Sequence, residues 1–413
     1  MNNKQKIIST CVFLFHSFLP MYAFKTTLSG YLKSDYFVDS RQSFGSSDGY
    51  NLFYPLMRND DFVGVDIHRK GQSQIMALAS RVKLTVDASG KLKSRTKGVF
   101  EVDINGRNNI SHLFRIRHAF FETEYDQFMF LAGHTWHPFY QSSHAPTLIS
   151  NNSGQPFETY SRHPQMRLTF SSGNTSLIGA LLSQVDFCSD GPLGNDNIYL
   201  FNSMIPELHV QLQQVFSGQW IAFGVDFKKI NPRIVTDKNF SVREYVHSVM
   251  AGIMGDFTYK KCNLKTKLMY AQNASEMVLM GGYAASSVDQ STDYRTYTPL
   301  SSISWWAQLS YKINDAVEPA LFVGYSYNLG ASDPVILSIN NTKTVYGFGT
   351  NIKQLARVSP RIRFTLFEVL ECAGELEYTH AWHGTLQTSG KVTENVKGSV
   401  GVVRMLASTR YCF

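Results

Sequence analysis

The sequence predicts an all-β fold, namely a transmembrane, antiparallel, up-and-down β-barrel of about 16 strands. Three observations predict it: an apolar leader, period-two alternation through the rest of the chain, and connections that are alternately short and long. Of the 413 residues, 13% are aromatic and 17% charged, against about 25% charged in ordinary soluble domains. A chain of this composition has much apolar surface to bury, which excludes a disordered, collagen-like or coiled-coil protein.

The first 23 residues have the pattern of a signal peptide. Lys4 and Lys6 precede the apolar stretch 7–19, and a small residue, Ala23, precedes a suitable cleavage point. An apolar stretch of about thirteen residues is shorter than the roughly 20 that a membrane-spanning helix needs, although an uncleaved anchor remains the alternative. We therefore expect export, with residues 24–413 forming the barrel.

Alternation of polar and apolar residues indicates strands in the mature chain. In residues 81–87 the odd positions are polar and the even ones apolar, and residues 265–270 and 361–366 repeat the pattern. This is the signature of a strand with one polar and one apolar face. No segment after the leader has a stripe with helical spacing, so no long helix is expected there.

Connections that are alternately short and long predict how the strands are joined. We expect short turns near 88–90, 126–127, 173–174, 217–218, 261–262, 314–315 and 358–360. Long polar loops are expected at 39–73, 105–111, 137–160, 188–201, 231–242, 277–300, 329–343 and 384–395. In outer-membrane barrels the turns are periplasmic and the loops extracellular. A water-soluble sandwich is the alternative, and the strand boundaries within 344–383 stay open.

The last strand, 396–413, carries a specific local signal. It ends on Tyr411 and Phe413, and a terminal Phe after aromatic or apolar residues at alternate positions resembles the strand by which Gram-negative barrels are recognised for assembly. The expected location is thus the outer membrane, with its lipid and the barrel assembly machinery as partners. Aromatic residues near strand ends fit the interfacial girdles: Tyr31, Phe37, Tyr125, Trp136, Trp220, Tyr259, Trp305, Trp306, Tyr311, Trp382 and Tyr411.

Several stretches resemble the DcaP-like branch of Gram-negative porins. They are 30–37, 115–122, 131–136 with Phe139 and Pro146 beyond, and 374–378. Members of that branch are trimeric barrels of sixteen strands, so the resemblance implies a homotrimer. By similarity to porins, the 137–160 loop would fold into the barrel and narrow it. An ordinary surface loop is the alternative. Its candidate constriction residues are His137, Phe139, Tyr140, Phe157 and Glu158, and Glu158 would set a transverse field against basic residues on the opposite wall.

Basic residues at alternating positions predict the chemistry of the interior. A barrel of this size holds water, so polar groups that point inward decide what passes. Alternation places on the lumen face Arg81, Lys83, Lys93, Arg95, Lys97, Arg115, Arg117, Arg167, Lys228, Lys265, Lys267, Arg361 and Arg363. Each one alone is explained by pairing with Asp87, Glu101, Asp103 or Asp226, but the set would concentrate anions.

The alternation also predicts the lipid face. It assigns to that face the apolar neighbours of these basic residues, namely Val82, Leu84, Ile116, Met166, Leu168, Leu268, Ile362 and Phe364.

Signals for catalysis or metal binding are weak. The stretch 45–49 matches G-x-S-x-G but lies in a Ser/Gly/Asp-rich loop rather than at a strand-to-helix elbow. His112, His118, His134, His137 and His163 are scattered without a metal-binding spacing. Four cysteines of the mature chain, Cys188, Cys262, Cys372 and Cys412, have no CxxC spacing, and their pairing is open. We expect no enzyme, no cofactor and no metal.

The sequence thus predicts a passive diffusion channel for small hydrophilic, preferentially anionic solutes such as carboxylates. The formal net charge of +7 falls to about +5 without Lys4 and Lys6, and a basic balance outside the cytoplasm points to anionic solutes or lipid headgroups rather than nucleic acid. The alternatives are a barrel whose long loops act as a surface adhesin or receptor, and a membrane-embedded hydrolase.

Overall fold

A computed structural model describes residues 24–89, 94–105, 114–339 and 342–413. The predicted signal peptide (1–23), the end of the predicted turn 88–90, Lys93, most of the predicted loop 105–111 and His112 lie outside the described residues. No helix in the described ranges is both long and apolar enough to cross a membrane.

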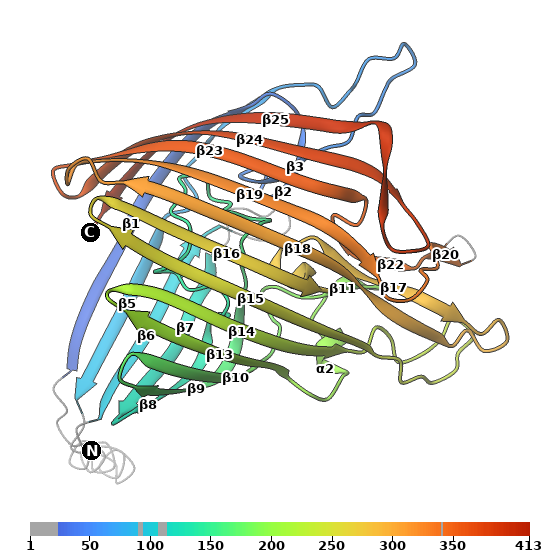
Figure 1. Cartoon of the computed structure of the whole chain (residues 1–413), viewed down its shortest axis with the longest axis horizontal. Coiled ribbons are helices and arrows are strands. Elements are labelled where there is room, and N and C mark those ends of the chain that lie inside the picture. The colour runs from blue at the N-terminus through green and yellow to red at the C-terminus, as the bar shows by residue number, and fades with distance from the viewer. Residues whose placement is uncertain (1–23, 90–93, 106–113, 340–341) are drawn as a thin grey trace, which may run out of the picture.

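The described chain forms a closed antiparallel β-barrel with sixteen wall strands, as the sequence predicts (Figure 1). In chain order the wall strands are β1 (Phe24–Asp39), β5 (Arg81–Ser89), β6 (Arg95–Ile104), β7 (Phe114–Tyr125), β8 (Phe128–Trp136), β9 (Arg162–Ser172), β10 (Thr175–Leu182), β13 (Glu207–Phe216), β14 (Gln219–Ile230), β15 (Val246–Tyr259), β16 (Cys262–Gln272), β18 (Arg295–Tyr311), β19 (Val317–Ala331), β23 (Ile352–Leu366), β24 (Leu370–Leu386) and β25 (Val392–Cys412).

The other elements are short and lie in the long connections. They are β2 (Ser43–Ser46), β3 (Asn51–Pro55), β4 (Gln72–Met76), β11 (Asp190–Gly191), β12 (Gly194–Asn195), α2 (Ile198–Phe201), η1 (Ser275–Met277), β17 (Gly281–Val288), β20 (Ser338–Ile339), β21 (Thr342–Lys343) and β22 (Val345–Phe348).

The first and last strands close the barrel. On one side β1 pairs with β5 and β4, and on the other side its residues 31–39 pair with β25. The backbone of Phe413 continues this seam, because its N–H donates to the Gly30 carbonyl at 3.1 Å and its carbonyl accepts from the Gly30 N–H at 2.9 Å. On the other side of β1, a Cβ at Gly30 would lie 2.3 Å from the Arg81 carbonyl oxygen, so only glycine lets β5 come this close.

Short turns and long loops lie at opposite ends of the barrel. One end of the barrel holds the start of β1, the end of β25 and the short turns (Figure 1). These turns are at 126–127, 173–174, 217–218, 260–261, 312–316 and 367–369. The long connections lie at the other end. This is the arrangement that the alternating connection lengths predict.

One predicted turn is wrong, and one predicted loop ends earlier than expected, since β18 begins at Arg295. Residues 358–360 lie inside β23, and the turn is at 367–369, where Phe367 and Glu368 have positive φ. Pro360 has no N–H to donate, and the pairing of β23 with β24 skips from Val358 to Arg361 while the strand continues. The predicted loop 277–300 contains β17 and the start of β18, which pair as a hairpin.

The two faces of the wall differ as the alternation predicts. All eight apolar residues assigned to the lipid face are exposed on the outside of the isolated chain, which suits contact with lipid. The girdle assignment is wrong for Phe37, Trp220 and Trp306, because their side chains are buried against inward-folded segments. It is also wrong for Tyr31 and Trp136, which line a cavity inside the barrel.

A buried arginine ties the closing seam to the first long connection. Arg404 of β25 donates to both carboxylate oxygens of Asp39 on β1, at 2.7 and 2.8 Å, and to the carbonyls of Gly49 (2.6 Å) and Tyr50 (2.8 Å). Both charged side chains are fully buried. A buried charge is stable only with such partners.

We predict that Arg404→Met weakens the barrel, because it leaves the Asp39 carboxylate buried without its cation. The free energy of unfolding should fall by about 3–5 kcal/mol, measured as a lower temperature for loss of the folded band in a gel-shift assay. Arg243→Met is the matched control, since Arg243 is exposed. Equal unfolding temperatures for the two variants would contradict the role of Arg404.

Candidate functional site

The segment 137–161, hereafter the crossing loop, leaves β8, spans the interior and returns into β9. The N–H groups of Ile149 and Ser150 donate to Glu375 of β24, at 2.5 and 3.2 Å. Lys33 of β1 donates to the Ile149 carbonyl at 2.8 Å. Arg357 of β23, nearly opposite β8 and β9 in the strand order, donates to the Gln155 carbonyl at 2.6 Å, so the loop crosses the interior.

Buried contacts hold the two ends of the crossing loop. Lys267 of β16 donates to the Phe139 carbonyl at 2.7 Å, to the Thr159 hydroxyl at 3.0 Å and to Glu158. Phe139, Phe157 and Glu158 are fully buried. The sequence predicts that Glu158 faces the passage, and this prediction is wrong. The carboxylate of Glu158 is buried and neutralises the ammonium group of Lys267.

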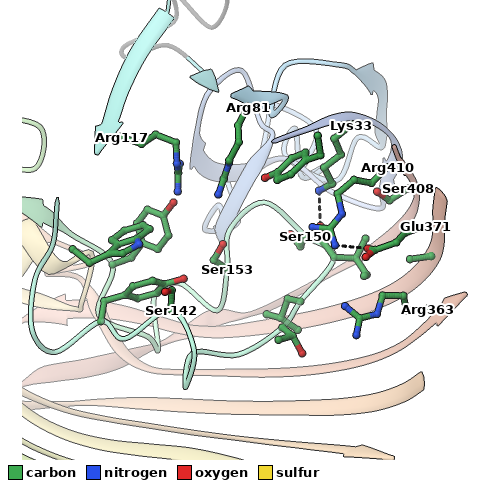
Figure 2. A pocket seen from close by; sticks show the side chains of 18 residues that line it. Lys33, Arg81, Arg117, Ser142, Ser150, Ser153, Arg363, Glu371, Ser408 and Arg410 are labelled. Carbon is green, nitrogen blue, oxygen red and sulfur yellow. Dashed lines mark hydrogen bonds and ion pairs between the residues drawn. The ribbon is translucent and has the colours of Figure 1, made fainter. Parts of the chain in front are cut away.

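A cavity of about 310 Å³ lies beside the crossing loop and is hereafter the chamber (Figure 2). Its wall side comes from β1, β5, β7, β8, β23, β24 and β25, and its other side from the crossing loop, including Tyr140 and Tyr160. The charged residues that line it are Lys33, Arg81, Arg117, Arg363, Arg410 and Glu371. Five of these six side chains are cationic.

Exposure decides which of these charges a solute in the chamber would meet. Arg117 is buried and bonded to Glu101 and Asp103 behind it, at 2.8 and 2.7 Å. The side chains of Arg81, Arg363 and Arg410 are 26%, 27% and 31% exposed, and that of Glu371, the partner of Arg410, is 22% exposed. Lys33 is paired with Asp35 at 2.8 Å and is less exposed than these residues. The more water-accessible charges of the chamber are thus three guanidinium groups and one carboxylate.

Tyr160 reports the sign of the potential in this region. Burial raises the pKa of the phenol, but the guanidinium groups of Arg117, Arg162, Arg115 and Arg81 together outweigh burial and lower the pKa of Tyr160 to about 8. Cations favour the phenolate because it is the charged form. The direction of this pKa shift indicates a positive potential at the end of the crossing loop.

The thirteen predicted pore-lining basic residues do not form one group. Three of them, Arg81, Arg117 and Arg363, line the chamber. Three others contact the crossing loop: Lys265 donates to the Ser143 carbonyl, Lys267 pairs with Glu158, and Arg361 donates to Thr147. Four more form ion pairs with acidic residues: Lys228 with Glu276, Arg115 with Asp103, Arg95 with Asp87, and Lys97 with Glu122. Arg167 donates to Gln165, and Lys83 lies opposite Glu101 on the neighbouring strand.

Sequence reasoning missed two of the chamber cations, Lys33 and Arg410, and three buried arginines, Arg162, Arg357 and Arg404. Arg357 and Arg404 share their inward face with the alternate residues of β23 and β25, so the same parity argument finds them. No local sequence pattern shows that Lys33 and Arg410 lie opposite each other. They do so because β1 and β25 are neighbours in the closed barrel.

No protein-family model and no curated protein matches the chain. Among solved structures, it is similar to the outer membrane channel DcaP of Acinetobacter baumannii, with a TM-score of 0.66 and 16% identity over 95% of this chain and 98% of that one. An anion-selective porin from Comamonas acidovorans matches with a TM-score of 0.58 and 10% identity over 95% and 100%. OmpT of Vibrio cholerae gives 0.55 and 10% over 96% and 99%.

These similarities define the class of the fold: the chain has the barrel fold of outer-membrane porins and channels. In particular, the DcaP-like fold that the sequence segments suggested is confirmed. At identities of 16% and below, the comparison concerns the fold alone.

We predict that Tyr160 ionises well before the other tyrosines. In a spectrophotometric titration of the folded protein, one tyrosinate should form near pH 8, below the ordinary tyrosine pKa of about 10. Tyr160→Phe should remove this step. Tyr125→Phe, at an exposed position of β7, should keep it. A titration with no step below the main one would contradict the positive potential assigned to this region.

Proposed function

We propose that the protein is a passive diffusion channel of the Gram-negative outer membrane for small hydrophilic, preferentially anionic solutes such as carboxylates. The observation that carries this proposal is the excess of water-accessible guanidinium groups, Arg81, Arg363 and Arg410, in the chamber beside the crossing loop.

Elementary electrostatics supports an anion preference. Charges of one sign inside low-dielectric walls raise the local concentration of the opposite ion. The planar fork of arginine donates two parallel hydrogen bonds to a carboxylate. Arg410 already makes an ion pair with Glu371, so a passing carboxylate would exchange with a protein carboxylate rather than meet an unsatisfied cation. Such exchange keeps binding weak enough for passage.

The comparisons support transport in a general way. The two structures described above as a channel and as an anion-selective porin match this chain over nearly its whole length. For this chain the solute class rests on its own charged residues.

We also propose that the protein makes and breaks no bond. The G-x-S-x-G stretch, 45–49, spans the turn between β2 and β3. The motif serves catalysis when its serine lies on a strand-to-helix elbow, which this hairpin is not. The location of this stretch therefore favours transport over hydrolysis.

We predict anion selectivity in planar bilayers that depends on the exposed chamber charges. In a salt gradient, the reversal potential of the wild-type protein should indicate anion preference. Arg81→Gln, Arg363→Gln and Arg410→Gln should each reduce that preference, and Glu371→Gln should increase it. Lys312→Gln, in an exposed turn, should leave it nearly unchanged. A cation-selective wild-type channel would refute the proposed solute class.

We further propose a homotrimer whose C-terminal residues Tyr411 and Phe413 are recognised by the barrel assembly machinery. The family resemblance supports the trimer, as does the existence of a trimer form of the similar OmpT. The first long connection carries a strongly exposed apolar tip, Phe62, Val63 and Val65. A surface of this kind is typical of protein contacts.

Cross-linking of the protein in detergent should therefore yield a species of three chains. Phe62→Ser combined with Val63→Ser should reduce its amount, because the exposed apolar tip is lost. Val396→Ser, at another fully exposed apolar position, is the control and should have no effect. Recovery of only single chains under conditions that preserve the folded barrel would count against the trimer.

A further inference from the structure

A buried cluster of imidazole and carboxylate groups lies where the crossing loop begins. His137 is the first residue of the loop, Glu207 and His209 belong to β13, and Asp226 belongs to β14. All four residues are at most 1% exposed. Three segments that are distant in sequence thus direct their polar groups to one enclosed point.

Three of these groups, His137, His209 and Asp226, are close enough together to share one metal ion. Nε2 of His137 lies 3.2 Å from Oε1 of Glu207 and 3.3 Å from Oδ2 of Asp226, and Nδ1 of His209 lies 3.3 Å from the same Asp226 oxygen. The ligand atoms of His137, His209 and Asp226 all lie within 4.8 Å of one another. Zinc with ligands at about 2.0–2.1 Å separates neighbouring ligand atoms by about 3.3 Å in a tetrahedron.

The charge of the cluster calls for a cation. Among the described residues, no lysine or arginine makes an ion pair with Glu207 or Asp226. Lys228, which also lies on β14, is engaged with Glu276 at 2.5 Å and with the Asn273 carbonyl. Within the described ranges, both oxygens of Glu207 and Oδ1 of Asp226 receive no hydrogen bond. Buried carboxylates normally pair with a cation or coordinate a metal.

We propose that His137, His209 and Asp226 bind one divalent transition-metal ion, with zinc the best match, and that Glu207, beside His137, adds negative charge to the site without ligating the ion. Imidazole nitrogen and carboxylate oxygen are ligands of zinc in proteins. This site is independent of the proposed conduction.

The surroundings of the two histidines also bear on coordination. Nε2 of His209 lies 3.2 Å from Oε1 of Gln211. A ligating histidine usually donates its other ring N–H to such an oxygen, which orients the ring. The Phe139 N–H lies 3.2 Å from Nδ1 of His137. Coordination through Nε2 puts the ring proton on Nδ1, so this contact must open when the ion binds.

An ion at this point would fasten the crossing loop to the wall. His137 begins the loop, whereas the other two ligands, His209 and Asp226, are paired neighbours on β13 and β14. Lys267 holds the loop from β16 at Phe139 and Thr159. The metal would add a second anchor, on β13 and β14.

The test uses the full-length folded protein in detergent, first treated with a chelator and then titrated with Co²⁺ as a spectroscopic probe. We expect the intense visible absorption of tetrahedral Co²⁺ at one ion per chain, and its loss when Zn²⁺ is added. His209→Asn and Asp226→Asn should each weaken binding roughly tenfold or more. His247→Asn, at an exposed position of β15, is the control and should bind like the wild type.

Absence of the tetrahedral absorption in the folded wild-type protein would overturn the proposal. An absorption that survives in both His209→Asn and Asp226→Asn would also overturn it, because the ion would then lie elsewhere. Should these variants fail to fold by the gel-shift assay, Gln211→Ala provides a milder measure. It keeps all three ligands and removes only the partner of His209, so the affinity should still fall, and an unchanged affinity would contradict the assignment.

Discussion

The structure depends on one constraint: within a bilayer, every backbone N–H and C=O of the wall needs a partner in the protein. The pairing of β1 with β25 meets it by leaving the sheet without an edge. Phe413 and Gly30 extend this seam with backbone hydrogen bonds, and the buried pair of Arg404 and Asp39 fastens it from inside. Closure then gives each strand an outer face toward lipid and an inner face toward water or inward-folded segments.

The interior is organised by charges that are buried in pairs. Lys267 with Glu158, and the carboxylate of Glu375 with backbone N–H groups of the loop, hold the crossing loop against strands far from it in sequence. Many inward cations are buried by such contacts, whereas the chamber is lined by partly exposed ones, Arg81, Arg363 and Arg410, each of which also pairs with a carboxylate: Glu101, Glu318 and Glu371 respectively. The electrostatic potential of the chamber thus depends on which carboxylates are buried behind the wall cations and which are exposed to water.

Particular residues show where sequence reasoning succeeded and where it failed. The alternation of Arg361 and Ile362 predicts opposite faces, and the structure places the first inside and the second outside. The turn predicted at 358–360 failed because a proline costs one ladder bond without ending a strand. The role expected for Glu158 failed because the sequence does not show that Lys267 comes within reach of it. Likewise, the scattered histidines gave no reason to connect His137 with His209 and Asp226.

By itself, the sequence determined the all-β class, the approximate number of strands and the face on which most wall residues lie. These properties follow from the local sequence, because the side chains of a strand alternate between its two faces whichever strands it pairs with. Only the tertiary structure decided which inward groups meet: Lys33 with Ile149, Glu375 with Ile149, and His137 with Asp226. Those contacts follow from barrel closure, strand register and the path of the crossing loop, because each joins segments that no local pattern relates.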